Sequence, residues 1–225
     1  MLMESFLSPM TAISKTLRPV IVLGSWSSGT TAVAGYLAKN GLHSCPPHAL
    51  TKDPRTPDCY ESLAFRKLCQ SVCSEHDLRV HKDFMRAAPA FQQWIQRSEK
   101  EALDIGKKGL VLKYPLCGLI IPLLASICTP RWIVVTRPFQ DIENTRLRRG
   151  WPELFGKKGA GIIYSRIFSS LNEQQQPFLA VPFPQFRASE QSRHQLLRYL
   201  DMPFTPASDE WVVEPPDAKN GEITR

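Results

Sequence analysis

A short apolar run followed by a glycine-framed loop is the feature that most constrains the fold of this chain. PVIVLG at 19–24 predicts a buried strand closed by glycine, and TTAVAGYLAKN at 30–40 predicts a helix. The loop between them, GSWSSGTT, has the frame of the phosphate-binding loop G-x-x-x-x-G-K-[ST], with Thr30 in place of the lysine. Backbone N–H groups and the helix dipole favour an anion at such a helix start. The stretch therefore predicts a phosphate site, with a Ser/Thr-capped tight turn as the alternative.

Strands and helices alternate along the rest of the chain. Apolar runs at 109–114, 131–138 and 178–183 predict three further strands, and each precedes a helical pattern. Alternation of this kind is typical of parallel sheets. We therefore expect an α/β fold, a three-layer sandwich with a central parallel β-sheet flanked by helices.

The bulk properties favour one domain. We place it at 19–204, between a loose arm at 1–18 and a proline-rich tail at 205–225. The six cysteines form no CxxC pair, which favours a reducing compartment. Because no apolar run is long enough to span a bilayer, we expect a cytoplasmic protein without a membrane partner.

Two segments have weaker patterns. Residues 78–81 are a possible short strand. Residues 150–161, rich in glycine and lysine, are expected to be mobile. They form either a lid that brings Lys157 and Lys158 near a nucleotide or a solvated basic loop.

Cations close two of the predicted strands. Lys113 and Arg137 stand at the carboxyl ends, where open α/β sheets bind their ligands. Thr145 lies two helical turns after Arg137, so guanidinium and hydroxyl can grip one phosphate together. A triphosphate site also needs the loop lysine and commonly an acidic residue for Mg²⁺. The strand-end cations, together with a net charge of +7, favour a ligand with several phosphates and no metal.

With the two motifs together, the chain resembles sulfotransferases that use 3′-phosphoadenosine 5′-phosphosulfate (PAPS), of the soluble bacterial type. In that family a [K/R]-S-G-T-[T/S] loop binds the 5′-phosphosulfate, and an arginine with serine eight residues later binds the 3′-phosphate. The resemblance covers about residues 19 to 204. It implies that PAPS is bound by Ser27, Ser28, Gly29, Thr30, Thr31, Arg137 and Thr145.

The resemblance also implies the reaction, an in-line sulfuryl transfer to a hydroxyl or amine of a small-molecule or glycan acceptor, without a metal. The family's loop cation is missing here, since Ser27 stands in its place, and Lys113 is the candidate substitute. Glu61 is the candidate base by its position. The plainer alternatives are a snorkelling strand-end lysine and an acid in the first turn of a helix.

Other interpretations of the candidate residues and of the function remain open. His48 and His81 are weaker candidates for the base, and the spacing of His43, Cys45, His48 and Cys59 matches no familiar metal site. A catalytically silent nucleotide-binding protein on the same scaffold is the main alternative, and a P-loop kinase or NTPase is a further one. Nucleic acid is not an expected partner, because aromatic and basic residues do not interleave.

Overall fold

The computed structural model describes residues 18–51, 53, 56, 58–209 and 212. At its centre lies a parallel sheet with the strand order β2-β1-β3-β4. The strands are β1 (Val20–Leu23), β2 (Val111–Lys113), β3 (Arg131–Thr136) and β4 (Phe178–Pro182). The predicted parallel α/β sheet is confirmed.

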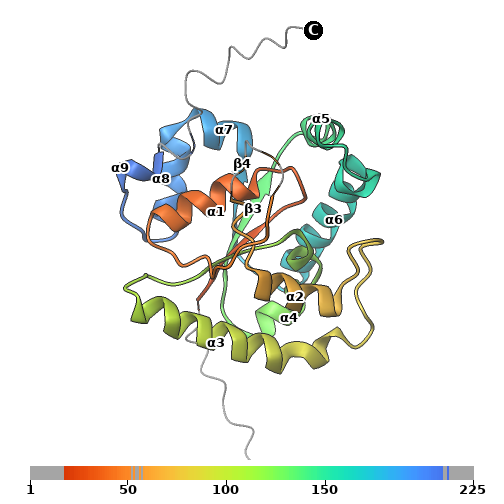
Figure 1. Cartoon of the computed structure of the whole chain (residues 1–225), viewed down its shortest axis with the longest axis horizontal. Coiled ribbons are helices and arrows are strands. Elements are labelled where there is room, and N and C mark those ends of the chain that lie inside the picture. Colours follow the sequence, from red (N-terminus) through yellow and green to blue (C-terminus); the bar gives the residue numbers. More distant parts are fainter. Residues whose placement is uncertain (1–17, 52, 54–55, 57, 210–211, 213–225) are drawn as a thin grey trace, which may run out of the picture.

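Side chains of the strands alternate between two cores because successive residues of a strand point to opposite faces. Ile21 and Leu23 pack into one core, whereas Val20 and Val22 pack into the other. The first core is covered by α2 (Leu63–Val72), α3 (Ala88–Asp104), α4 (Ile121–Ile127) and α6 (Lys157–Glu173). The second is covered by α1 (Thr30–Lys39), α7 (Phe183–Ala188) and α8 (Glu190–Tyr199), which gives the three layers of Figure 1.

The remaining elements are short, apart from α5. This helix, α5 (Phe139–Arg149), follows β3, where the sequence predicts a helical pattern. The 3₁₀ turns are η1 (Phe84–Ala87), η2 (Pro115–Leu119) and η3 (Glu153–Phe155). A last helix, α9 (Pro206–Asp209), lies in the segment expected as a tail and is bonded to α8 by Arg193 and Asp209 at 2.7 Å. All of the expected N-terminal arm except Arg18 lies outside the described residues.

The strand order reverses at β1. The chain passes from β1 to β2 on one side and then to β3 on the other, so both neighbours of β1 are reached by crossovers. Helices that start from neighbouring strands at such a point leave a crevice outside the carboxyl ends of the strands. The loop after β1 therefore opens into the crevice that this topology provides.

The prediction of a mobile loop at 150–161 is wrong, because η3 and the start of α6 occupy this segment. Gly159 allows the start of α6 to pack closely against η3, because a Cβ at this position would overlap the carbonyl oxygen of Leu154. The helical spacing of Ile163, Tyr164 and Ile167, all buried, continues the helix beyond the glycines.

The short strand at 78–81 is also absent from the described structure. Val80 forms only a single bridge with Cys73, and Leu78 has a left-handed backbone with φ of 57°. A turn therefore replaces the extended run that the apolar residues had indicated.

The two glycines of α6 provide a test of this packing. Gly159→Ala should lower the free energy of unfolding by about 1–3 kcal/mol, because the new methyl group meets the Leu154 backbone. Gly161→Ala, where a Cβ meets nothing within 4 Å, should leave stability unchanged or raise it by up to about 1 kcal/mol. Urea denaturation followed by circular dichroism measures both, and equal effects would contradict the packing described.

Candidate functional site

Both frame glycines of the loop after β1 are required by its geometry. Gly24 has φ of +155°, and a Cβ there would lie 2.7 Å from Ser28 Oγ and 2.9 Å from the Val135 carbonyl oxygen. Gly29 has φ of +99°, and a Cβ there would overlap the ring of Phe183. Residues with side chains rarely adopt such φ values, so the G-x-x-x-x-G frame follows from the backbone of this turn.

A cleft of about 610 Å³ lies at the carboxyl ends of the strands. Among the described residues that line it, six side chains are cationic and three are carboxylates. The cationic ones are Arg66, Lys113, Arg137, Arg148, Arg149 and Arg187. The carboxylates are Asp53, Glu61 and Glu75. The excess of positive charge suits an anionic ligand.

The loop presents part of its predicted phosphate site to this cleft. Gly29, Thr30 and Thr31 line it, at a helix start where N–H groups lack intrahelical partners. Ser28 does not line it, because its hydroxyl is buried and donates to the Ser25 carbonyl oxygen at 2.7 Å. Ser27 lines the cleft in a left-handed turn, with φ of 62°. The Ser27 hydroxyl is buried and bonds to none of the described residues.

Arg137 joins the loop to the second predicted phosphate site. Its Nη1 donates to the Ser27 carbonyl oxygen at 3.0 Å and to Thr145 Oγ1 at 3.3 Å. Thr145 Oγ1 in turn donates to the Asp141 carbonyl oxygen at 2.9 Å. Ser27 and Arg137 are 110 residues apart in the sequence, and the Arg137 guanidinium therefore brings the two motifs into contact.

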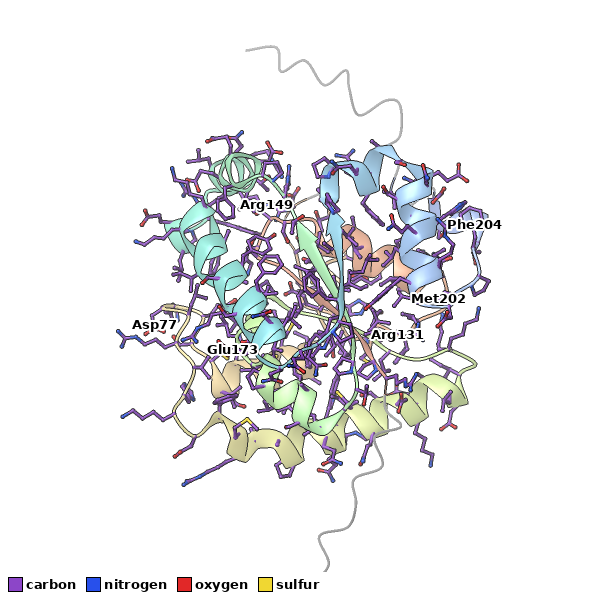
Figure 2. The ribbon with its side chains drawn as sticks, turned by 180° about the vertical axis from the view of Figure 1, so that it is seen from behind. Asp77, Arg131, Arg149, Glu173, Met202 and Phe204 are labelled. Carbon is purple, nitrogen blue, oxygen red and sulfur yellow. The ribbon has the colours of Figure 1, made fainter. Side chains whose placement is uncertain are left out.

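Three further arginines surround Arg137, and the sequence pattern had not singled them out. Burial lowers the pKa of Arg137, and repulsion from Arg187, Arg149 and Arg148 lowers it further, while Asp141 opposes the change. Figure 2 shows Arg149 at the end of α5, at the opposite end of the sheet from Arg131. Such crowding of like charges makes the binding of an anion favourable.

One carboxylate balances part of this charge. Asp53 accepts from Arg149 at 2.7 Å and from Arg148 at 3.2 Å. Its side chain is only 7% exposed. The segment between α1 and α2 is thereby bonded to the end of α5, on one wall of the cleft. No spacing in the sequence indicated this contact.

The two predicted catalytic side chains, Lys113 and Glu61, form an ion pair beside the loop. Lys113 Nζ lies 2.6 Å from Glu61 Oε1. It also donates to Thr31 Oγ1 at 3.1 Å and to the Cys59 carbonyl oxygen at 3.2 Å. Because an ammonium group has three donors, each of them has an acceptor. The side chains are 5% and 12% exposed, so the pair is nearly buried at the edge of the cleft.

The other candidates lie elsewhere. His48 Nδ1 is 2.8 Å from Asp58 Oδ2, His81 is exposed, and neither residue lines the cleft. Lys157 and Lys158 are also absent from its lining, and Lys158 pairs with Glu153 at 3.1 Å. Within the described ranges, no group of three or more His, Cys, Asp or Glu side chains is arranged to hold a metal ion. In the same ranges, no helix combines the length and apolar character that crossing a membrane requires.

Two sulfotransferase domains are among the solved structures that share this fold. A sulfotransferase domain from the curacin biosynthetic pathway matches with a TM-score of 0.56 and 16% identity, over 87% of this chain and 77% of that one. A sulfotransferase domain from the Synechococcus PCC 7002 olefin synthase matches with a TM-score of 0.52 and 16% identity, over 88% and 78%. No protein-family model and no curated protein sequence matches the chain. The chain therefore has a sulfotransferase-like fold, as its motifs predicted.

A double-mutant cycle tests the ion pair of Lys113 and Glu61. Lys113→Met and Glu61→Ala should each destabilise the protein, because each leaves a nearly buried charge without its partner. The double variant should recover part of the loss, with a coupling of about 1–3 kcal/mol in chemical denaturation. The exposed pair of Lys158 and Glu153 is the matched control and should give nearly additive effects. Additive losses at Lys113 and Glu61 would contradict the pairing.

Proposed function

We propose that this chain is a sulfotransferase that moves a sulfuryl group from PAPS to a hydroxyl or amine of a small-molecule or glycan acceptor. The observation that carries the proposal is the adjacency of two anion sites in one cleft. Arg137 bonds both the Ser27 carbonyl oxygen and Thr145, so the sites share a guanidinium. A nucleotide with phosphates at its 3′ and 5′ positions presents two anionic groups, one for each site. The sulfotransferase-like fold supports the same function.

The proposed donor site uses the residues that line the cleft. Gly29, Thr30 and Thr31 hold the 5′-phosphosulfate with backbone N–H groups and hydroxyls. Arg137 and Thr145 hold the 3′-phosphate. Ser27 contributes backbone to this site, and Ser28 shapes the loop through its bond to Ser25. Arg148, Arg149 and Arg187 add long-range attraction for the ligand.

The proposed chemistry is a direct exchange of bonds at sulfur. The acceptor oxygen or nitrogen forms a bond to sulfur while the bond from sulfur to the 5′-phosphate oxygen breaks. Glu61 takes the acceptor proton, and Lys113 offsets the charge that develops on the leaving phosphate. Lys113 already touches Thr31 of the loop, so an exchange of one hydrogen-bond acceptor suffices to engage the phosphate.

A catalytically silent nucleotide-binding protein is the second candidate. Two observations favour it: a buried serine hydroxyl occupies the position of the family's loop cation, and all three donors of Lys113 are engaged. A P-loop kinase or NTPase fits less well, because Thr30 replaces the loop lysine and cations close β2 and β3.

Calorimetry separates these candidates by their ligands. Adenosine 3′,5′-bisphosphate should bind without added metal, and ATP with Mg²⁺ should bind at least about tenfold more weakly. Arg137→Lys and Thr145→Val should each weaken the bisphosphate about tenfold, because each removes a charged or charge-assisted hydrogen bond to the 3′-phosphate. Arg131→Lys, on the far end of the sheet, is the control and should bind as the wild type does. Preference for ATP with Mg²⁺ would overturn the donor assignment.

Transfer of labelled sulfuryl groups from PAPS to a mixed acceptor pool distinguishes an enzyme from a silent binder. The wild type should transfer label, and Glu61→Gln should lower kcat by about a hundredfold or more because the proton acceptor is lost. Bisphosphate affinity of the Glu61→Gln variant should stay within about twofold of the wild type. Tight binding of the bisphosphate without any transfer by the wild type would favour the silent binder.

A further inference from the structure

The end of the cleft beside Glu61 is lined by alternating charges. Glu61 Oε1 lies 2.6 Å from Lys113 Nζ, and Glu61 Oε2 lies 3.9 Å from Arg66 Nη1. Arg66 Nη2 in turn lies 3.4 Å from both carboxylate oxygens of Glu75. Lys113, Glu61, Arg66 and Glu75 thus form one row of alternating charges that includes the predicted base, Glu61.

Glu75 is held in place by neutral donors as well. Tyr114 donates its hydroxyl to Glu75 Oε1 at 3.0 Å, and Gln70 donates to Glu75 Oε2 at 3.1 Å. Gln70 also donates to the Tyr114 hydroxyl at 3.2 Å. Arg66, Tyr114 and Gln70 thus all donate to this carboxylate. The wall is therefore a fixed pattern of donors and acceptors.

Arg66 and Glu75 are more exposed than Lys113 and Glu61. Lys113 and Glu61 are 5% and 12% exposed, whereas Glu75 is 21% and Arg66 is 32% exposed. Arg66 and Glu75 both line the cleft. One offers N–H donors and the other offers oxygen acceptors, side by side.

Aromatic rings line the same cleft. Trp26, which precedes the phosphate loop residue Ser27, is stacked on Phe155 with ring centroids 4.3 Å apart. Trp151 meets Phe155 edge-on at 6.0 Å. Trp151 and Phe155 are only partly buried and pack against the core that also contains Tyr114. Their rings are nearly perpendicular, at 89°, and they contribute apolar surface to the cleft that the charged row also lines.

We propose that the acceptor is a saccharide, bound by Arg66 and Glu75 through its hydroxyls, with its C–H groups against the apolar part of the lining at Trp151 and Phe155. This inference rests on the proposed transferase function and names its acceptor. A sugar hydroxyl donates to a carboxylate and accepts from a guanidinium, so neighbouring hydroxyls match the Arg66–Glu75 pair. An apolar alcohol or phenol would remove water from both charges without replacing its hydrogen bonds, which is costly. A bare anionic acceptor would meet the Glu75 carboxylate.

Acceptors that differ only in the sugar test the proposal. With labelled PAPS, phenyl β-D-glucoside, phenyl β-D-galactoside and phenyl β-D-glucuronide are compared with phenol and benzyl alcohol. The aglycone of the glycosides has no hydroxyl, so label on them must lie on the sugar. At least one glycoside should accept label, and phenol and benzyl alcohol should accept at least about tenfold less. Equal or better transfer to phenol or benzyl alcohol would overturn the proposal.

Binding gives a readout that does not depend on turnover. Saturation-transfer NMR should show contact with the sugar protons of a glycoside when the protein is saturated with adenosine 3′,5′-bisphosphate. Glu75→Gln and Trp151→Ala should each weaken this binding about tenfold, and Glu75→Gln should leave bisphosphate affinity within about twofold. Arg79→Lys, an exposed arginine paired with Asp77, is the matched control, and circular dichroism checks that each variant folds.

The outcomes separate the two proposals. Binding of the bisphosphate without binding of any glycoside would overturn the saccharide acceptor and leave the transferase function standing. Failure of the bisphosphate to bind would instead refute the donor assignment, and the glycosides would then be tested on the free protein. Glycoside affinities that do not change in Glu75→Gln and Trp151→Ala would also overturn the acceptor site.

Discussion

The parallel pairing of β1 with β2 on one side and β3 on the other is the constraint on which the cleft depends. The register places Val22 opposite both Lys113 and Ile133, so all three strands end at the same edge of the sheet. The phosphate loop follows the middle strand, a lysine closes one neighbour, and Arg137 follows the other. Three segments far apart in the chain therefore converge without any long loop to carry them.

The electrostatics of the cleft divide into two parts. Around Arg137 the charge is largely positive. Asp53 offsets part of it by accepting hydrogen bonds from Arg148 and Arg149. Around Lys113 opposite charges alternate and nearly cancel. Ser27 stands at the position of the missing loop cation. The Arg137 guanidinium donates to the carbonyl oxygen of Ser27 at 3.0 Å. An anion at the loop is thus met by cations that come from the neighbouring strands.

Local patterns predicted the strands, the loop and the strand-end cations, because each depends on a few consecutive residues. Two contacts could not be predicted, because tertiary packing brings their residues together. Asp53 joins a loop to α5, and Glu75 joins a turn to Arg66 of α2. The start of α6 was missed for a different reason. Glycine lowers the helical signal at Gly159 and Gly161, although the neighbouring Leu154 backbone leaves no room for a larger residue at Gly159.

The aromatic lining of the cleft also makes the site optically visible. Trp26, within the loop after β1, lies against Phe155, and the guanidinium of Arg149 lies 4.5 Å from the ring centroid of Trp151. By contrast, Trp94 and Trp132 are buried in the core, with exposed fractions of 8% and 0%. A ligand that draws Arg149 away from its ring would change the surroundings of Trp151 while leaving those of Trp94 and Trp132 as they are. Among the tryptophans that the structure describes, Trp151 thereby reports on the cleft, whereas Trp94 and Trp132 report on the core.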